Sequence, residues 1–153
     1  MSTEKNTLPT ESIIYPLTSA KIAELHTWRA SLFEKAATLW EACAQNEVWC
    51  ARAAANNAKL MQQQAASTGM PPSGPAPTTA AVALAAMKRA EEQRAGAKYE
   101  RVLAGAVAPN RTFDLSATSY LEMIMDPSAQ MMPPDLDEAP GGAPSGALNI
   151  PRN

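Results

Sequence analysis

Bulky apolar residues are scarce in this sequence of 153 residues. Leu, Ile, Val and Phe together occupy 23 positions, about 15% of the chain, whereas folded domains usually exceed about 20%. Alanine alone supplies 31 positions. Because alanine loses no side-chain entropy in a helix and is depleted in strands, this composition favours helix and argues against an all-β fold. We therefore expect an all-α protein with a core of small side chains.

Residues that carry chemistry are equally few. His26 is the single histidine, and it lies at the edge of the apolar stripe of the first predicted helix. With Cys43 and Cys50 it lacks the fourth ligand of a zinc site, and no second histidine completes a catalytic set. The glycine-rich stretch 141–146 is interrupted by proline and follows no strand, unlike a phosphate-binding loop. The sequence therefore predicts no enzyme, no cofactor and no metal site.

Long apolar runs and an excess of positive charge are also missing. The longest apolar stretch, Ala80–Met87, has eight residues, far short of the roughly 20 that a membrane span needs. Residues 2–12 contain no apolar core of a signal peptide. The net charge of −2 argues against a dedicated nucleic-acid-binding protein. We expect a chain without a membrane span that is not secreted by a signal peptide and lies in the cytoplasm or in a virion.

Thirteen prolines divide the chain. They leave two long proline-free intervals, and this spacing predicts four segments. These are an extended arm over 1–17, a helical hairpin over 18–108 with a connector at about 69–77, a short helix within 109–126, and an extended tail rich in proline and glycine over 127–153.

The first helix of the hairpin is expected to run from Thr18 or Ser19 to about residue 67 and to end at Gly69. Its large apolar residues fall within one arc of about 140°, with the 3–4 spacing of a coiled coil. Arg29 interrupts this seam, and a break of the helix is possible near Asn56–Asn57. The arc contains Ile22, Leu25, Trp28, Leu32, Phe33, Ala36, Leu39, Trp40, Cys43, Cys50 and Met61.

The second helix is expected over about 80–107, capped by Thr78 or Thr79. Its buried face consists of alanines, which permit close approach of another helix. They are Ala83, Ala86, Ala90, Ala97 and Ala104. The short third helix starts at Ser116 or Ser119.

The two cysteines are seven positions apart. On one straight helix their Cα atoms would lie roughly 10 Å apart, which is beyond the reach of a disulfide. We expect two reduced, half-buried thiols.

Several apolar side chains fall outside the helix stripe and are candidates for binding partners. Trp49 points away from the stripe, either because it packs under the second helix or the arm, or because it anchors another chain. The other candidates are apolar residues near the end of the arm and widely spaced apolar residues along the tail. The candidate partner-binding residues are Ile13, Ile14, Tyr15, Trp49, Leu136, Leu148 and Ile150.

These features favour a non-enzymatic structural or assembly subunit of a large complex. The architecture is typical of a bacteriophage virion component, such as a head–tail, portal-associated or internal protein. Its partners would be protein subunits, in a homo-oligomer or ring. The alternative is a nucleic-acid-associated packaging or regulatory protein that uses a basic cluster on the second helix, although Glu91 and Glu92 lie within that cluster. The cluster consists of Lys88, Arg89, Arg94, Lys98, Arg101 and Arg111.

Overall fold

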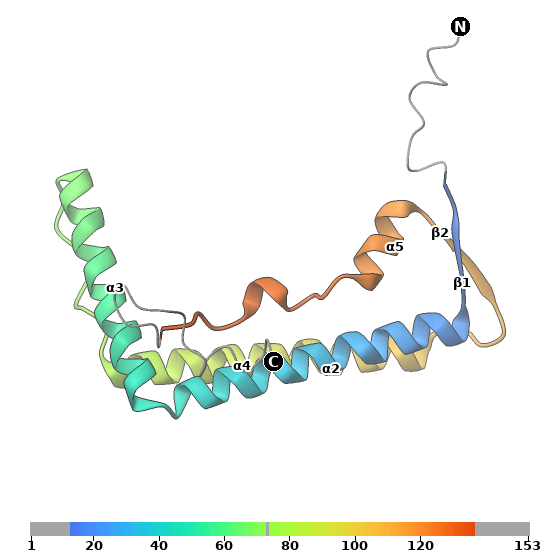
Figure 1. Ribbon diagram of the computed structural model, residues 1–153, viewed down its shortest axis with the longest axis horizontal. Coiled ribbons are helices and arrows are strands. Elements are labelled where there is room, and N and C mark those ends of the chain that lie inside the picture. Colours follow the sequence, from blue (N-terminus) through green and yellow to red (C-terminus); the bar gives the residue numbers. More distant parts are fainter. Residues whose placement is uncertain (1–12, 73, 137–153) are drawn as a thin grey trace, which may run out of the picture. The chain divides into compact units, whose positions relative to one another are not determined.

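The chain is mostly helical in the computed structural model, which describes residues 13–72 and 74–136 (Figure 1). This agrees with the alanine-rich composition. A short antiparallel strand pair accompanies the helices. In chain order the elements are β1 (Tyr15–Thr18), α2 (Ser19–Ala44), α3 (Glu47–Thr68), α4 (Thr79–Ala106), β2 (Thr112–Leu115), α5 (Ala117–Ile124) and the 3₁₀ turn η2 (Ala129–Met131).

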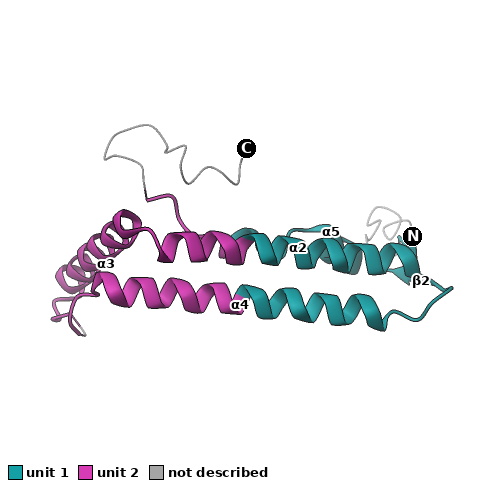
Figure 2. Ribbon diagram, turned by 90° about the horizontal axis from the view of Figure 1, so that it is seen from below, with its two compact units in different colours: residues 1–35, 93–130 teal, residues 36–92, 131–153 magenta. Residues whose placement is uncertain are grey.

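The chain forms two compact units, coloured separately in Figure 2. Unit 1 consists of residues 1–35 and 93–130, and unit 2 consists of residues 36–92 and 131–153. Helices α2 and α4 each contribute to both units. The expected division into four consecutive segments stays a prediction.

The helix expected over 18–67 is interrupted at Gln45–Asn46, ahead of the position anticipated at Asn56–Asn57. Asn46 adopts an extended conformation, and its side chain accepts a hydrogen bond from the Trp49 backbone N–H at 3.0 Å. Asparagine at this position competes with the helix for backbone donors, which stops α2 and caps α3. Helix α3 then ends at Gly69 as expected, because the left-handed φ of 73° suits glycine.

The strand pair is the element that the sequence did not predict. Strands β1 and β2 run antiparallel, with Tyr15 opposite Leu115 and Thr18 opposite Thr112. The pairing continues into α2, where Ser19 N donates to the Arg111 carbonyl at 2.8 Å. Each strand has only four residues, too few for an alternating pattern to stand out, and the partners are far apart in sequence. The expected arm is therefore paired at its residues 15–17.

Unit 1 brings the first part of α2 and the second part of α4 together in antiparallel fashion. Phe33 packs against Gly96, and the Glu34 carboxylate pairs with Arg101 Nη2 at 2.6 Å. Ala30 and Ala97 are buried in this contact region of their helices. Small side chains on both helices let the two backbones approach closely.

Unit 2 has its own core, contributed by α2, α3 and α4. Trp40 and Trp49 supply most of its bulk and meet edge to face, with ring centroids 6.2 Å apart. Alanines and the two cysteines fill the remainder, which agrees with the expected core of small side chains. The buried residues of this core are Ala37, Trp40, Cys43, Trp49, Cys50, Ala53, Val82, Ala86 and Ala90.

Local signals placed the other helix ends correctly. Thr78 Oγ1 accepts from Ala81 N at the start of α4, and the side chain of Ser116 caps α5. Within the described ranges, no helix is long and apolar enough to cross a bilayer.

The close approach at Gly96 predicts opposite effects for two glycine substitutions in α4. A Cβ at Gly96 would lie 2.9 Å from the Phe33 ring, whereas a Cβ at Gly105 meets nothing within 4 Å. Gly105→Ala should raise the free energy of unfolding by up to about 1 kcal/mol through helix propensity. Gly96→Ala should lower it, because overpacking costs about 1–3 kcal/mol.

Thermal melts followed by circular dichroism measure both variants. Equal stabilisation by the two substitutions would show that Phe33 does not pack on this glycine.

Candidate interaction site

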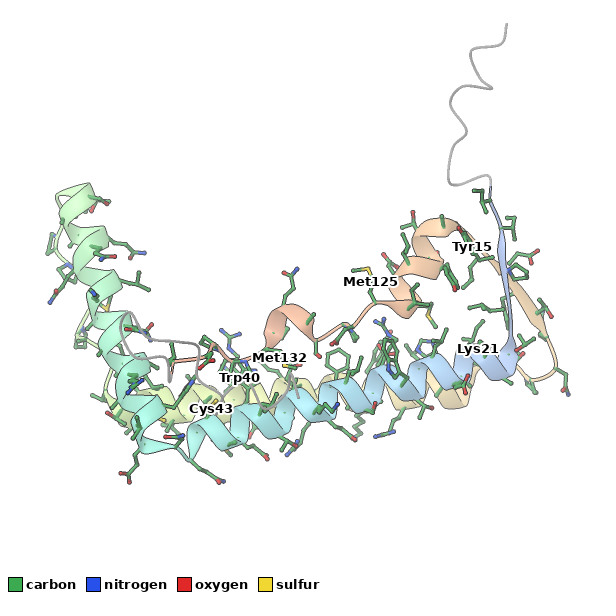
Figure 3. All side chains as sticks on the ribbon, in the orientation of Figure 1. Tyr15, Lys21, Trp40, Cys43, Met125 and Met132 are labelled. Carbon is green, nitrogen blue, oxygen red and sulfur yellow. The ribbon has the colours of Figure 1, made fainter. Side chains whose placement is uncertain are left out.

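Three side chains of unit 2 hold the backbone of an extended segment. Trp40 Nε1 donates to the Met131 carbonyl at 2.6 Å, and Trp49 Nε1 donates to the Pro134 carbonyl at 3.0 Å. Arg52 Nη1 donates to the Leu136 carbonyl at 2.9 Å. We call Trp40, Trp49 and Arg52 the carbonyl track. Figure 3 labels Trp40 on α2 and Met132, a residue of this segment.

The segment needs such donors because of its composition. Pro133 and Pro134 lack a backbone N–H and hold the chain extended, so its carbonyls find no partners in secondary structure. An indole N–H is a donor only, and it suits a buried carbonyl. Domains that bind polyproline-type peptides also place aromatic side chains against such segments. The track therefore binds the carbonyl of Met131 at the end of η2 and the carbonyls of Pro134 and Leu136 in the extended residues that follow.

A groove adjoins the carbonyl track. Its volume is about 400 Å³, and its lining is mainly apolar. Arg89 covers one side, with its guanidinium carbon 5.6 Å from the centroid of the Trp40 ring. We call this cavity the unit 2 groove. It is lined by Trp40, Trp49, Ala53, Asn56, Asn57, Leu60, Val82, Ala85, Ala86, Arg89, Pro134 and Leu136.

Unit 1 contains a cluster of three ionisable side chains, in which Glu100 is buried and His26 and Arg29 are half-buried. His26 Nδ1 lies 2.7 Å from Glu100 Oε1, and Arg29 Nε lies 3.2 Å from the same oxygen, an ion pair without hydrogen-bond alignment. Arg29 Nη1 also donates to the carbonyls of Glu122 and Met125, the latter at 3.1 Å. The cation therefore caps the C-terminal end of α5, where the helix dipole favours positive charge.

This cluster explains two expectations from the sequence. Arg29 interrupts the apolar seam because it reaches α5, and His26 lies at the boundary of the stripe because its partner is Glu100. The geometry of the cluster supports a structural role, holding α5 against α2 and α4.

An apolar patch covers the outer side of α5 and the neighbouring part of α2. Trp28 is 39% exposed, although its place on the helix stripe predicted a core position. With Leu25 and Ile124 it lines a cavity of about 420 Å³. Leu121 and Ile124, three positions apart on α5, are exposed, as is Met125, which directly follows the helix and is labelled in Figure 3. We call Trp28, Leu121, Ile124 and Met125 the unit 1 patch.

The predicted partner-binding residues fall into different places. Ile13 and Ile14 are exposed, whereas the Tyr15 ring stacks on Tyr120 at 4.5 Å. Trp49 is only 3% exposed, so it takes the first of its two alternatives and packs within its own chain rather than standing free as an anchor. Leu136 packs against the unit 2 core. Leu148 and Ile150 lie outside the described residues.

Sequence reasoning missed Trp40 and Arg52 as binding residues. Trp40 was placed in the core, where it lies, but nothing in the helix pattern showed that its indole N–H faces a carbonyl. Arg52 lies three positions after Trp49 on α3, and this spacing puts both on one helix face. The sequence did contain a signal for this contact. Two donors, Trp49 and Arg52, lie three positions apart, and Pro133–Pro134 marks a segment whose carbonyls need donors.

The two cysteines are free, as expected, although the reason for expecting it was wrong. The break at Asn46 lies between them, so they do not share one straight helix. The Cys50 thiol donates to the Cys43 carbonyl at 3.3 Å, and both residues are buried. Burial raises the pKa of the Cys50 thiol, and the Glu47 carboxylate raises it further.

Several members of the predicted basic cluster have partners within the chain. Arg101 pairs with Glu34, Arg89 lies over Trp40, and Arg111 lies over the Phe113 ring at 5.7 Å. These contacts use positive groups that a phosphate backbone would otherwise bind.

A comparison of the chain with protein-family models, with curated proteins and with solved structures gives no match. Among the described residues, no group of three or more His, Cys, Asp or Glu side chains could hold a metal ion.

The burial of the tryptophans predicts an order of stability that differs from their order on the helix stripe. Trp49→Ala should lower the free energy of unfolding by about 3–5 kcal/mol, since it removes a core aromatic ring and the donor to Pro134. Trp28→Ala should cost well under half as much, because that ring is partly solvated. Denaturant unfolding of both variants provides the measurement, and a larger loss for Trp28→Ala would contradict this core.

The raised pKa of Cys50 predicts a loss of stability at alkaline pH. The folded chain holds the thiol proton more tightly than the unfolded chain. The contribution is therefore complete below the unfolded-state pKa, about 8.5, and is lost as pH rises from there toward the folded-state pKa.

Unfolding by urea between about pH 7 and pH 10 measures this loss, with Cys50→Ala as the reference for all other titrating groups. The wild type should lose more stability than the variant over this range. Parallel curves would show that the thiol ionises as freely in the folded chain as in the unfolded one.

Proposed function

We propose that this chain is a non-enzymatic structural subunit that binds neighbouring subunits through its helix faces and extended ends. The concrete version is a component of a bacteriophage virion, built as a helical hairpin with a short third helix and extended arms, in a homo-oligomer or ring. The virion assignment is supported by architecture alone, since a fold does not define a function.

The observation that carries the proposal is the distribution of apolar side chains. Within the described ranges the core consists mostly of alanine and cysteine, with Ile22, Trp40, Trp49 and Val82 as its larger members. Many large apolar side chains lie outside it. The exposed ones are Ile13, Ile14, Trp28, Val48, Leu60, Met70, Leu84, Met87, Tyr99, Val102, Leu121, Ile124, Met125 and Met131.

Helix α4 illustrates this arrangement. Ala86, Ala90 and Ala97 occupy its buried face, while Leu84, which is 72% exposed, and Val102 lie on the opposite face of the same helix. Leu84 and Val102 lie 18 positions apart, with Lys88, Glu91 and Lys98 between them on that face, so each is a separate apolar contact point for a neighbouring protein. Burial of these side chains by neighbouring subunits would supply the apolar contact that the alanine core lacks.

The ends of the chain offer further contacts. Ile13 and Ile14 precede β1, are exposed, and could lie on a neighbouring subunit without disturbing the strand pair. Leu148 and Ile150 remain candidate contacts of the tail.

The nucleic-acid alternative receives less support. Arg89, Arg101 and Arg111 already contact Trp40, Glu34 and Phe113. Binding to a phosphate backbone would weaken steeply as salt rises, which distinguishes it from apolar association.

Assembly predicts that the native mass depends on the unit 1 patch. Leu121→Glu should shift the purified protein toward monomer, because it places a charge in an apolar interface. Gln63→Glu adds the same charge at an exposed polar position of α3 and serves as the matched control.

Light scattering coupled to size-exclusion chromatography gives the mass of both variants and the wild type, at low and high salt. A wild-type chain that stays monomeric at all concentrations, or that associates only with nucleic acid and only at low salt, would contradict the proposal.

A further inference from the structure

The sequence Met-Pro-Pro occurs twice in this chain. Residues 132–134 carry one copy, in the segment that the carbonyl track binds, and residues 70–72 carry the other, just after α3. We propose that residues 70–72 of a second copy of the chain bind in the unit 2 groove, beside residues 132–134 of the first. This inference rests on the proposed function, because it names two of the surfaces through which copies would assemble.

The motif at 132–134 shows how unit 2 binds this sequence. Trp40 Nε1 donates to the carbonyl of Met131, just before the motif, and Trp49 Nε1 donates to the carbonyl of Pro134, its last residue. These carbonyls are three residues apart, which is one turn of a polyproline helix. Both contacts are made to the backbone, so they suit a segment whose prolines leave carbonyls without helix or sheet partners. The tryptophan side of the groove therefore accepts a Met-Pro-Pro segment.

The groove has room and donors for a second segment of this kind. Its volume is about 400 Å³, within the roughly 300–1,000 Å³ of ligand clefts. Trp40 and Trp49 line it together with the exposed residues Asn57 and Arg89. The amide and the guanidinium are donors, and the Asn57 side chain makes no hydrogen bond within the described ranges. These donors suit the carbonyls of an incoming segment, while its Met side chain packs against the aromatic lining.

Residues 70–72 are exposed where they lie in their own chain. Met70 is 66% exposed, and Pro71 and Pro72 are exposed as well. Together with Met61 they line a separate cavity of about 280 Å³, and none of the three lines the unit 2 groove. The two prolines give this segment the same need for outside donors as the motif at 132–134.

The length of α3 places this contact between two chains. Asn57 and Thr68, the last residue of the helix, are 11 positions apart, about 17 Å along the helix axis. Pro72 is four residues beyond Thr68, so it can return along the helix by at most about 14 Å. The groove that receives residues 70–72 therefore belongs to another copy. A contact between two different surfaces is head-to-tail, and it continues into a ring or an open filament.

A disulfide between two different chains tests the contact. One chain carries Met70→Cys and is labelled with heavy nitrogen, and the other carries Asn57→Cys, so that mass spectrometry distinguishes mixed dimers from like dimers. Lys59→Cys replaces Asn57→Cys in the matched control, because residue 59 is exposed, outside the groove lining and on the opposite side of the helix. Cys43 and Cys50 stay in place, because both are buried.

Mild oxidation of equal amounts of the two chains gives the yields. A disulfide requires Cα atoms within about 7 Å, so we expect the mixed dimer of the Asn57 pair to exceed that of the Lys59 pair by at least about tenfold. Equal yields in the two pairs, or no mixed dimer, would overturn the proposal. A chain that carries both Met70→Cys and Asn57→Cys should form no disulfide with itself at low concentration. Such a bond would also overturn the proposal, because the segment would then fill its own groove.

Native mass provides a second measurement that needs no cysteine substitution. Met70→Lys should lower the mean mass of the assembled protein, because it brings a positive charge into a mainly apolar groove beside Arg89. Pro75→Lys adds the same charge at an exposed position of the same connector, outside the motif, and should leave the mass unchanged. Equal masses for the two variants would contradict the contact.

The same mass measurement separates this inference from the proposed function. If Leu121→Glu dissociates the wild-type assembly and Met70→Lys does not change its mass, the groove contact is wrong and the proposed function stands. A wild-type chain that is monomeric at every concentration overturns both.

Discussion

The small size of alanine is the constraint on which this structure depends. Alanine faces on α2 and α4 allow the helix backbones to approach closely, but each residue removes little apolar surface from water. Large aromatic rings pack between the helices at few positions. These are Trp40 and Trp49 in unit 2 and Phe33 in unit 1. A fold of this kind has secondary structure of high propensity but few contacts that fix one packing arrangement over another.

Specific polar contacts supply part of what the core lacks. In unit 1, Arg29 joins Glu100 of α4 to the last carbonyls of α5. In unit 2, two indoles and one guanidinium hold an extended segment by its backbone. Both devices bind carbonyls that have lost their helix or sheet partners, and a buried carbonyl left without a donor is costly. These contacts therefore determine where the short C-terminal elements lie within each unit.

The sequence predicted the features that depend on neighbouring residues and failed on those that depend on distant ones. The alanine face of α4, the cap at Ser116 and the left-handed Gly69 follow from local rules. The strand pair does not, because β1 and β2 are short and their paired residues, from Tyr15–Leu115 to Thr18–Thr112, are 100 to 94 positions apart.

The tryptophans show how a single local event changes a prediction. The predicted apolar stripe assumed one continuous helix. Because the helix breaks at Asn46, the residues of α3 do not continue the angular pattern of α2. Trp49 consequently lies in the core beside Trp40. Trp28 sits on the predicted stripe but is partly exposed beside Ile124, since a periodic pattern does not tell which residues a neighbouring element will cover.

The strand pair also sets the order of events when the chain is made. Tyr15–Thr18 emerges from the ribosome early, but its partner Thr112–Leu115 and the stacking residue Tyr120 follow only after all of residues 36–92 have been synthesised. Closing so long a loop carries an entropic cost, and contacts of high sequence separation form slowly. Unit 2 has most of its core residues available before β1 can pair. Unit 1 thus needs residues that are made later than most of the unit 2 core, and Ile13 and Ile14 precede a strand whose partner is not yet synthesised.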